Sequence, residues 1–181
     1  MGMEEHHIRL VFELVEALEK STSGDLPKEI LECMKEHKMI AAGAALAPIP
    51  GAATVGYAAN VWTMYARING KLGIKFSQNI LKTVASGVIA NLGSYALAVT
   101  IGETLKFLPG VGTALGIAID ASVFWALTHT AACIYIKALT AMAKKNLTSE
   151  EALGAEVERV LNEDKEEIKA IMKEAKKSYK K

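Results

Sequence analysis

The most constraining feature of this sequence is a long stretch that almost lacks charged side chains. The chain has 181 residues with 21 basic and 20 acidic side chains, yet only seven of these lie between residues 39 and 136. They are Arg67, Lys71, Lys75, Lys82, Glu103, Lys106 and Asp120. A stretch this poor in charge gains free energy by leaving water, so it must be buried in its own core, in a partner or in lipid.

Apolar residues recur at helical spacing along the chain, and no alternating pattern typical of β-strands competes with them. Turn and capping residues divide the chain into segments expected to be helical. These segments are residues 4–20, 25–46, 52–69, 78–106, 112–144, 150–161 and 163–178. We predict an all-α, single-domain helical bundle of about six to seven helices, with a central apolar Ala/Gly-rich helical hairpin.

The two ends of this single domain, residues 1–181, differ from its middle. Residues 38–145 form an apolar core region, whereas residues 1–37 and 146–181 carry Glu and Lys on one face of each expected helix. We interpret the end segments as amphipathic flanking helices that cover the apolar hairpin.

Two related turns interrupt the apolar stretch. The run Pro50-Gly51-Ala52-Ala53-Thr54 matches Pro109-Gly110-Val111-Gly112-Thr113, and each run precedes an apolar helix with a pair of aromatic residues. A duplicated turn–helix unit and a chance match are both open explanations. We identify these turns as candidate hinges, formed by Pro48, Pro50, Gly51, Pro109 and Gly110.

The lengths of the uncharged runs test whether this stretch spans a membrane. A helix rises ~1.5 Å per residue, and the hydrocarbon core is ~30 Å thick. Residues 51–66 are too short, residues 83–102 just suffice, and residues 111–136 carry Asp120 near their centre. A central Asp costs roughly 2.5–3.5 kcal/mol on insertion. Only residues 83–102 make a clean span, so we favour a closely packed core of small residues that is sheltered from lipid.

Two groups of ionisable residues are candidate functional sites. Arg67, Lys71, Lys75 and Lys82 cluster around one loop between apolar runs, where they could meet anionic headgroups or simply keep the loop in solution. Asp120 could be a buried switch, or it could lie on the polar edge of its helix.

The sequence contains no phosphate-binding loop, metal-ligand spacing or nucleophile motif. We therefore expect no enzymatic activity, metal or cofactor, and the net charge of +1 does not favour nucleic acid as a partner. Cys33 and Cys133 lie far apart, which predicts free thiols in a reducing compartment. Glu4 and Glu5 stand where a signal peptide would be basic, so we expect a cytoplasmic protein, in solution, peripheral to a membrane or associated with the inner membrane.

Four short motifs carry a family resemblance. They are Ala47-Pro48-Ile49-Pro50-Gly51, Tyr65-Ala66-Arg67-Ile68, Gly73-Ile74-Lys75-Phe76-Ser77 and Leu108-Pro109-Gly110-Val111-Gly112-Thr113. Over residues 38–145 the chain resembles the bacterial YcjF-type, GTPase-associated helical domain, a domain of unknown function. The resemblance implies an all-α module that occurs beside GTPase domains or membrane segments and acts at membranes. It implies no catalytic residues, and since this sequence contains no GTPase domain, the implied GTPase would be a partner in trans.

These observations lead to one favoured function and two alternatives. The favoured function is a non-enzymatic helical module that associates with membrane lipid, or with a membrane-acting partner such as a GTPase, through the sheltered hydrophobic hairpin around Pro50 and Pro109. The alternatives are a pore-forming, toxin-like protein with an insertable hairpin, and a carrier of a hydrophobic ligand. A second copy of the chain is a further expected partner.

Overall fold

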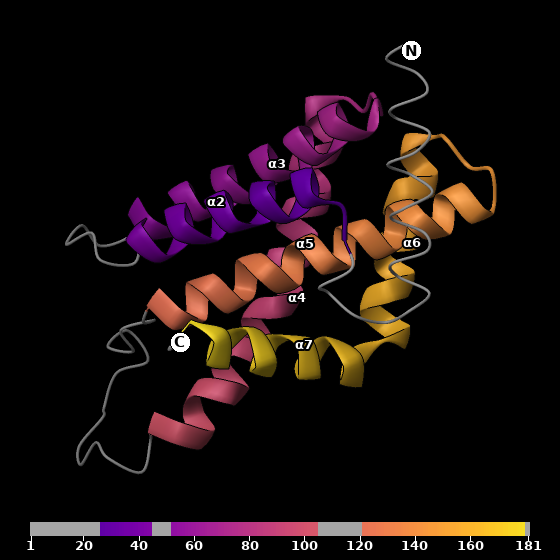
Figure 1. Ribbon diagram of the computed structural model, residues 1–181. Coiled ribbons are helices and arrows are strands. Elements are labelled where there is room, and N and C mark those ends of the chain that lie inside the picture. Colours follow the sequence, from indigo (N-terminus) through magenta and orange to yellow (C-terminus); the bar gives the residue numbers. More distant parts are fainter. Residues whose placement is uncertain (1–25, 45–51, 105–120, 180–181) are drawn as a thin grey trace.

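The computed structural model describes residues 26–44, 52–104 and 121–179, with backbone only for residues 52–55 and 96–104. The described helices are α2 (Lys28–Ala44), α3 (Ala52–Leu72), α4 (Gln78–Thr104), α5 (Ala121–Lys144), α6 (Glu150–Glu163) and α7 (Lys165–Ser178). Helix α5 runs through the middle, with α2 on one side and α7 on the other (Figure 1). The described residues form no strand, so the predicted all-α helical bundle is confirmed.

Most of the predicted helices are confirmed, with ends that differ by at most three residues from the prediction. Helix α5 covers the last 24 residues of the segment predicted at 112–144. The predicted helix at residues 4–20 lies outside the described residues. So do all the candidate hinge and switch residues, which are Pro48, Pro50, Gly51, Pro109, Gly110 and Asp120.

Helix α3 ends later than predicted because Gly70 remains helical and Gly73 takes the left-handed conformation instead. Gly73 has φ 69°, and the Ile74 amide donates to the Asn69 carbonyl at 2.9 Å. This hydrogen bond satisfies a carbonyl that the helix end would otherwise leave free. The same pattern closes α5, where Asn146 has φ 53°. Backbone hydrogen bonds therefore fix both turns, the one after α3 and the one after α5.

Helix α5 is the centre of the core. It contacts each of the other described helices, and 17 of its 24 residues are buried. A helix that is apolar on nearly every side is stable in water only when neighbours surround it. Its buried threonine hydroxyls donate to carbonyls one turn earlier in the same helix, at 2.8–2.9 Å, which removes the cost of burying them. These residues are Thr128, Thr130 and Thr140.

Two stacked tyrosines join α3 to α5. The rings of Tyr65 and Tyr135 lie 4.0 Å apart with an interplanar angle of 6°, and both residues are fully buried. The Tyr65 hydroxyl donates to the Ala131 carbonyl at 3.1 Å, and the Tyr135 hydroxyl donates to Asn69 Oδ1 at 2.9 Å. Each phenol therefore exchanges water for a protein acceptor, as buried hydroxyls require.

The contacts also set the directions of the helices. Three contacts join α3 to α5 at nearly equal sequence separation: Tyr57 to Phe124, Tyr65 to Ala131, and Asn69 to Tyr135. Helices α3 and α5 are therefore parallel. Lys38, late in α2, lies over the ring of Trp125, early in α5, so α2 runs antiparallel to α5.

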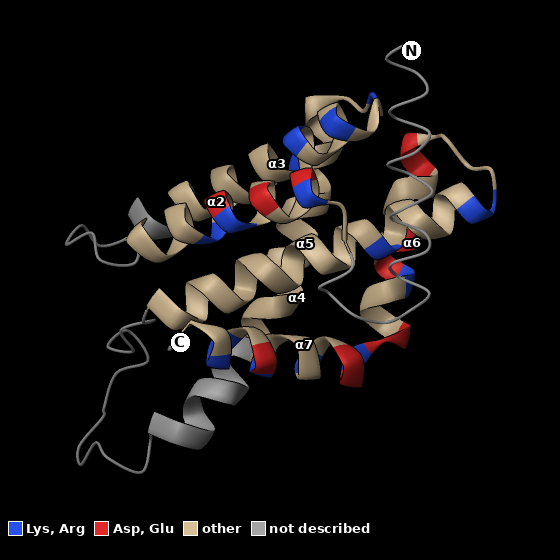
Figure 2. Cartoon of the chain, in the orientation of Figure 1, with Lys and Arg blue, Asp and Glu red and all other residues tan. Residues whose placement is uncertain are grey.

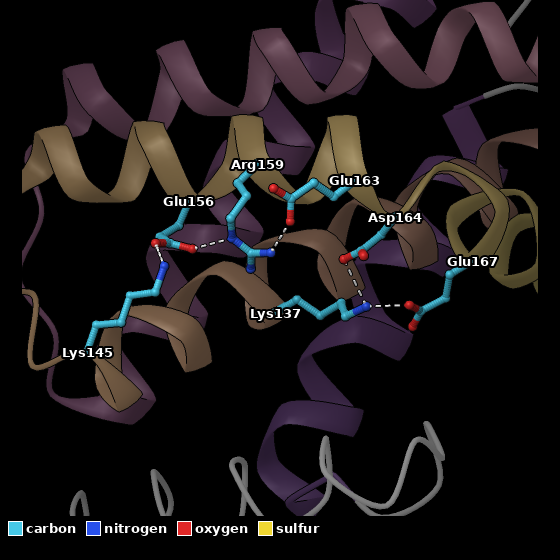
Figure 3. Close-up of polar contacts among 7 residues, drawn as sticks. All are labelled: Lys137, Lys145, Glu156, Arg159, Glu163, Asp164 and Glu167. Carbon is cyan, nitrogen blue, oxygen red and sulfur yellow. Dashed lines mark hydrogen bonds and ion pairs between the residues drawn. The ribbon is translucent and has the colours of Figure 1, made fainter.

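Charged side chains join the end of α5 to α6 and α7 (Figure 3). Lys137 Nζ lies 3.1 Å from the Asp164 carboxylate and 2.5 Å from that of Glu167. The carboxylate of Glu156, a buried residue of α6, lies 2.8 Å from Arg159. Because several charges share partners, this network positions the amphipathic helices more firmly than isolated surface pairs would.

We predict that Tyr135→Phe lowers the free energy of unfolding by about 1–3 kcal/mol, because Asn69 Oδ1 would remain buried without its donor. Denaturant unfolding would measure the loss. Tyr179→Phe is the matched control, because Tyr179 is 41% exposed. Equal stability of the two variants would show that the buried hydrogen bond contributes nothing.

Candidate functional site: an uncharged end and a histidine-lined helix

Apart from Lys38, the described charged side chains of α2 to α5 lie towards one end of the bundle. They fall within residues 28–38 of α2, residues 67–82 around the α3–α4 turn, and residues 137–144 of α5. Because α3 and α5 are parallel and α2 is antiparallel to α5, these stretches meet at the same end, which we call the charged end (Figure 2). At the opposite end, which we call the uncharged end, Lys38 is the one charged residue among the described side chains of α2 to α5.

Two large apolar side chains are exposed near the uncharged end. Met39 and Ile40, in the last two turns of α2, are 58% and 55% exposed. Neighbouring hydrophobic residues of this size normally turn inward, so a pair left in water is a candidate contact surface. The chain enters and leaves residues 45–51, which hold the first candidate hinge, from the helix ends at this side.

The last turn of α7 also reaches the uncharged end. Trp125 Nε1 donates to Ser178 Oγ at 3.3 Å, and the Tyr179 ring lies 5.6 Å from the Trp125 ring. Lys38 Nζ lies 4.5 Å from the centre of the same indole. One aromatic side chain of α5 therefore connects α2 and α7, and it places a cation beside the apolar end.

The basic residues predicted as a membrane or partner surface lie at the charged end instead. Arg67 pairs with Glu36 of α2 at 2.6 Å, and Lys82 Nζ lies 5.1 Å from the centre of the Trp62 ring. Lys75 is exposed in the α3–α4 turn, and Lys71 is half-buried. The structure therefore groups these basic residues around one turn, but separates them from the helix ends that flank the first candidate hinge.

His37 is buried between α2 and α3. It is 2% exposed, its Nε2 lies 3.2 Å from Arg67 NH1, and its Nδ1 lies 2.7 Å from Asn60 Oδ1. A guanidinium can only donate, so Nε2 accepts and Nδ1 carries the proton that is donated to Asn60. The imidazole is therefore neutral. Burial, together with the charge of Arg67, lowers the pKa of His37 despite the hydrogen bond that its ring donates to Asn60.

A second histidine lies on α5, facing α2. His129 Nε2 is 3.7 Å from Cys133 Sγ, and His129 Nδ1 is buried with no hydrogen-bond partner among the described residues. Burial and the positive charge of Lys38 lower the pKa of His129 to about 4. His37 therefore lies beside a guanidinium at the α2–α3 interface, and the charge of Lys38 in α2 acts on His129.

The Cys133–His129 pair has the composition of a nucleophilic dyad but not its electrostatics. Activation requires a lowered thiol pKa, whereas burial raises the pKa of Cys133 to about 12. Cys33 and Cys133 are both free thiols, as predicted. In the part of the chain that the structure describes, no three His, Cys, Asp or Glu residues are placed to hold a metal ion.

Length and composition would allow one helix to cross a membrane. Among the described side chains that helix is α5, and 83% of its apolar window is buried inside the fold. Core helices of soluble proteins have the same properties. Residues 83–102, the span that the sequence favours, extend past the described side chains of α4, so that prediction stays open.

Comparisons with known proteins identify no relative. No family model, curated protein or solved structure matches the chain. The resemblance to the YcjF-type domain therefore stays a prediction.

Sequence reasoning missed the histidines and the exposed pair. A signal for His37 was present, because it lies at helical spacing with Ile30, Cys33 and Met34 on the buried face of α2. For Met39 and Ile40 the sequence held no such signal, since apolar residues at the end of an apolar stretch are normally expected to be buried.

The lowered pKa of His129 predicts that the folded chain loses stability in acid. The usual imidazole pKa of 6.5 exceeds that of folded His129, so between about pH 6.5 and pH 4 the unfolded chain binds more protons. The free energy of unfolding is then unaffected above about pH 7 and falls by roughly 3 kcal/mol as the pH decreases to about 4. Urea unfolding across this range measures the loss, and His129→Gln should flatten it. A loss that is unchanged in the variant would assign acid sensitivity to other groups.

Proposed function

We propose that this chain is a non-enzymatic helical module that associates peripherally with a membrane through its uncharged end. The observation that carries the proposal is the segregation of charge, because the described charges of α2 to α5 other than Lys38 gather at the opposite end. A module with this polarity can place one end against an apolar medium without dehydrating a charge of these helices other than that of Lys38.

The exposed pair supports the same orientation. Met39 and Ile40 lie near the uncharged end, and the adjoining residues 45–51 include no charged side chain. Burying a Met or Ile side chain contributes roughly 1.5–3 kcal/mol when burial is complete. Two such side chains can sustain reversible binding, while α5 stays inside the bundle.

Lys38 and the aromatic residues beside it suit an interfacial position. Trp and Tyr collect where apolar and aqueous phases meet, and basic residues near them are attracted to anionic lipid. Trp125, Tyr179 and Lys38 form one row of contacts beside the uncharged end. A GTPase partner in trans is a further part of the proposal that rests on the family resemblance alone.

Vesicle flotation tests the orientation. We expect the wild-type chain to float with vesicles that contain anionic lipid. The double variant Met39→Ser/Ile40→Ser should bind these vesicles at least roughly tenfold more weakly. Leu147→Ser is the matched control, because Leu147 is 41% exposed in the α5–α6 turn, at the charged end. Absence of wild-type flotation would reject the proposal, and equal losses in the two variants would reject the orientation.

The pore-forming alternative is favoured by one observation, the burial of the apolar helix α5 beneath amphipathic neighbours. At 24 residues α5 would extend ~36 Å, enough to cross the hydrocarbon core. Its insertion would need Lys137 to leave two carboxylate partners. We predict that vesicles floated with the protein retain an entrapped dye at neutral pH, and dye release would instead favour this alternative.

A further inference from the structure

Helix α2 differs from the other helices around α5 because histidine side chains take part in its polar interactions. On its α3 side, His37 accepts a hydrogen bond from Arg67 and donates one to Asn60. On its α5 side, Lys38 acts electrostatically on His129. The contact with Arg67 requires a neutral imidazole at His37, and the charge of Lys38 disfavours a proton on His129. Protonation of either histidine would therefore add a positive charge near a cation that is already present.

At His37 a second proton would occupy Nε2, the atom that now accepts from Arg67 at 3.2 Å. Two donors would then face each other, and a buried cation would lie beside the guanidinium. The other charged group facing His37 is Glu36, which already pairs with Arg67 at 2.6 Å and is more than half exposed. Glu36 therefore offsets part of the repulsion from Arg67, and burial of the imidazole is the larger reason why a second proton is unfavourable.

At His129 the charged group that acts on the imidazole is Lys38 from α2, while the neighbouring Cys133 is a neutral thiol. The charges of Glu167 in α7 and Lys137 in α5 also act on Cys133, but these two residues form an ion pair with each other. A proton on His129 would therefore meet Lys38 in a mostly buried setting. The ammonium would relieve this by leaving the ring of Trp125, which weakens the contact between α2 and α5.

The contacts of α6 and α7 respond differently to mild acid. They rely on carboxylates that are held by cations, as with Asp164 and Glu167 on Lys137. Hydrogen bonds from Lys145 and Arg159 lower the pKa of Glu156, so this carboxylate stays charged when imidazoles gain protons. Moderate acid is thus expected to weaken the contacts of α2 more than the contact that Glu156 makes in α6.

We propose that α2 is an acid-released latch: protonation of His37 and His129 detaches α2 from α3 and α5 while α6 and α7 remain in place. Release uncovers the α2-facing side of α5, including Trp125, and frees the end that carries Met39 and Ile40. The consequence for membrane binding rests on the proposed function, whereas the release itself does not.

Hydrogen exchange measured by mass spectrometry at about pH 7.5 and pH 5, with rates corrected for intrinsic pH dependence, tests the latch. With a pKa of about 4 in the closed state and 6.5 in the open state, His129 alone raises the opening equilibrium of α2 roughly 25-fold. We expect this increase in residues 28–44, and far smaller changes in α6 and α7.

Variants separate the two histidines from general acid effects. His129→Gln and His37→Gln should each reduce the increase, provided that α2 remains protected at neutral pH. If either variant loses that protection, Lys38→Met replaces it: removing the cation beside His129 should shift α2 release to lower pH while both imidazoles stay in place. Unchanged exchange in α2 at acid pH, or equal loss of protection in α2, α6 and α7, would overturn the latch.

Flotation with anionic vesicles at the same pH values keeps the two proposals apart. Release of α2 in acid together with stronger vesicle binding supports both. Release without vesicle binding at either pH supports the latch and rejects the proposed function. Equal vesicle binding at both pH values, with α2 protected throughout, supports the proposed function and rejects the latch.

Discussion

The rest of the structure depends on surrounding α5. A helix with most of its residues buried cannot face water, so each neighbour must supply an apolar side to it. Small side chains on α5 let the neighbours approach closely. Its polar groups are satisfied either within the helix, as with the threonine hydroxyls, or by one specific partner, as with Tyr135 and Asn69. Burial of α5 therefore fixes both the packing and the few polar contacts that the core can contain.

The parallel arrangement of α3 and α5 turns a charge pattern along the chain into a polarity in space. Each helix has its charges late, around Arg67 in α3 and Lys137 in α5, and α2 has its charges early. Had α3 and α5 been antiparallel, charges would lie at both ends of the bundle and no uncharged end would exist. The polarity thus depends on contacts such as Tyr65 to Ala131 as much as on composition.

Helix positions could be predicted from the sequence because periodicity and capping are local, as the Ser149 cap of α6 illustrates. Glycine frequently ends a helix, so Gly70 led to a predicted end of α3 that is too early. The left-handed turn is made three residues later by Gly73. The candidate site was beyond such reasoning. Whether Arg67 contacts lipid or Glu36 depends on how α2 and α3 pack, which no local pattern encodes.

Buried histidines are a costly way to complete an interface, and their placement is therefore informative. An apolar residue at position 37 or 129 would fill similar space without losing stability in acid. His37 instead lies beside Arg67 at the α2–α3 interface, and the charge of Lys38 in α2 acts on His129, whereas the polar contacts of α6 and α7 are made by carboxylates paired with cations. This difference in chemistry is the reason for proposing that α2 is the element whose contacts respond first to protons.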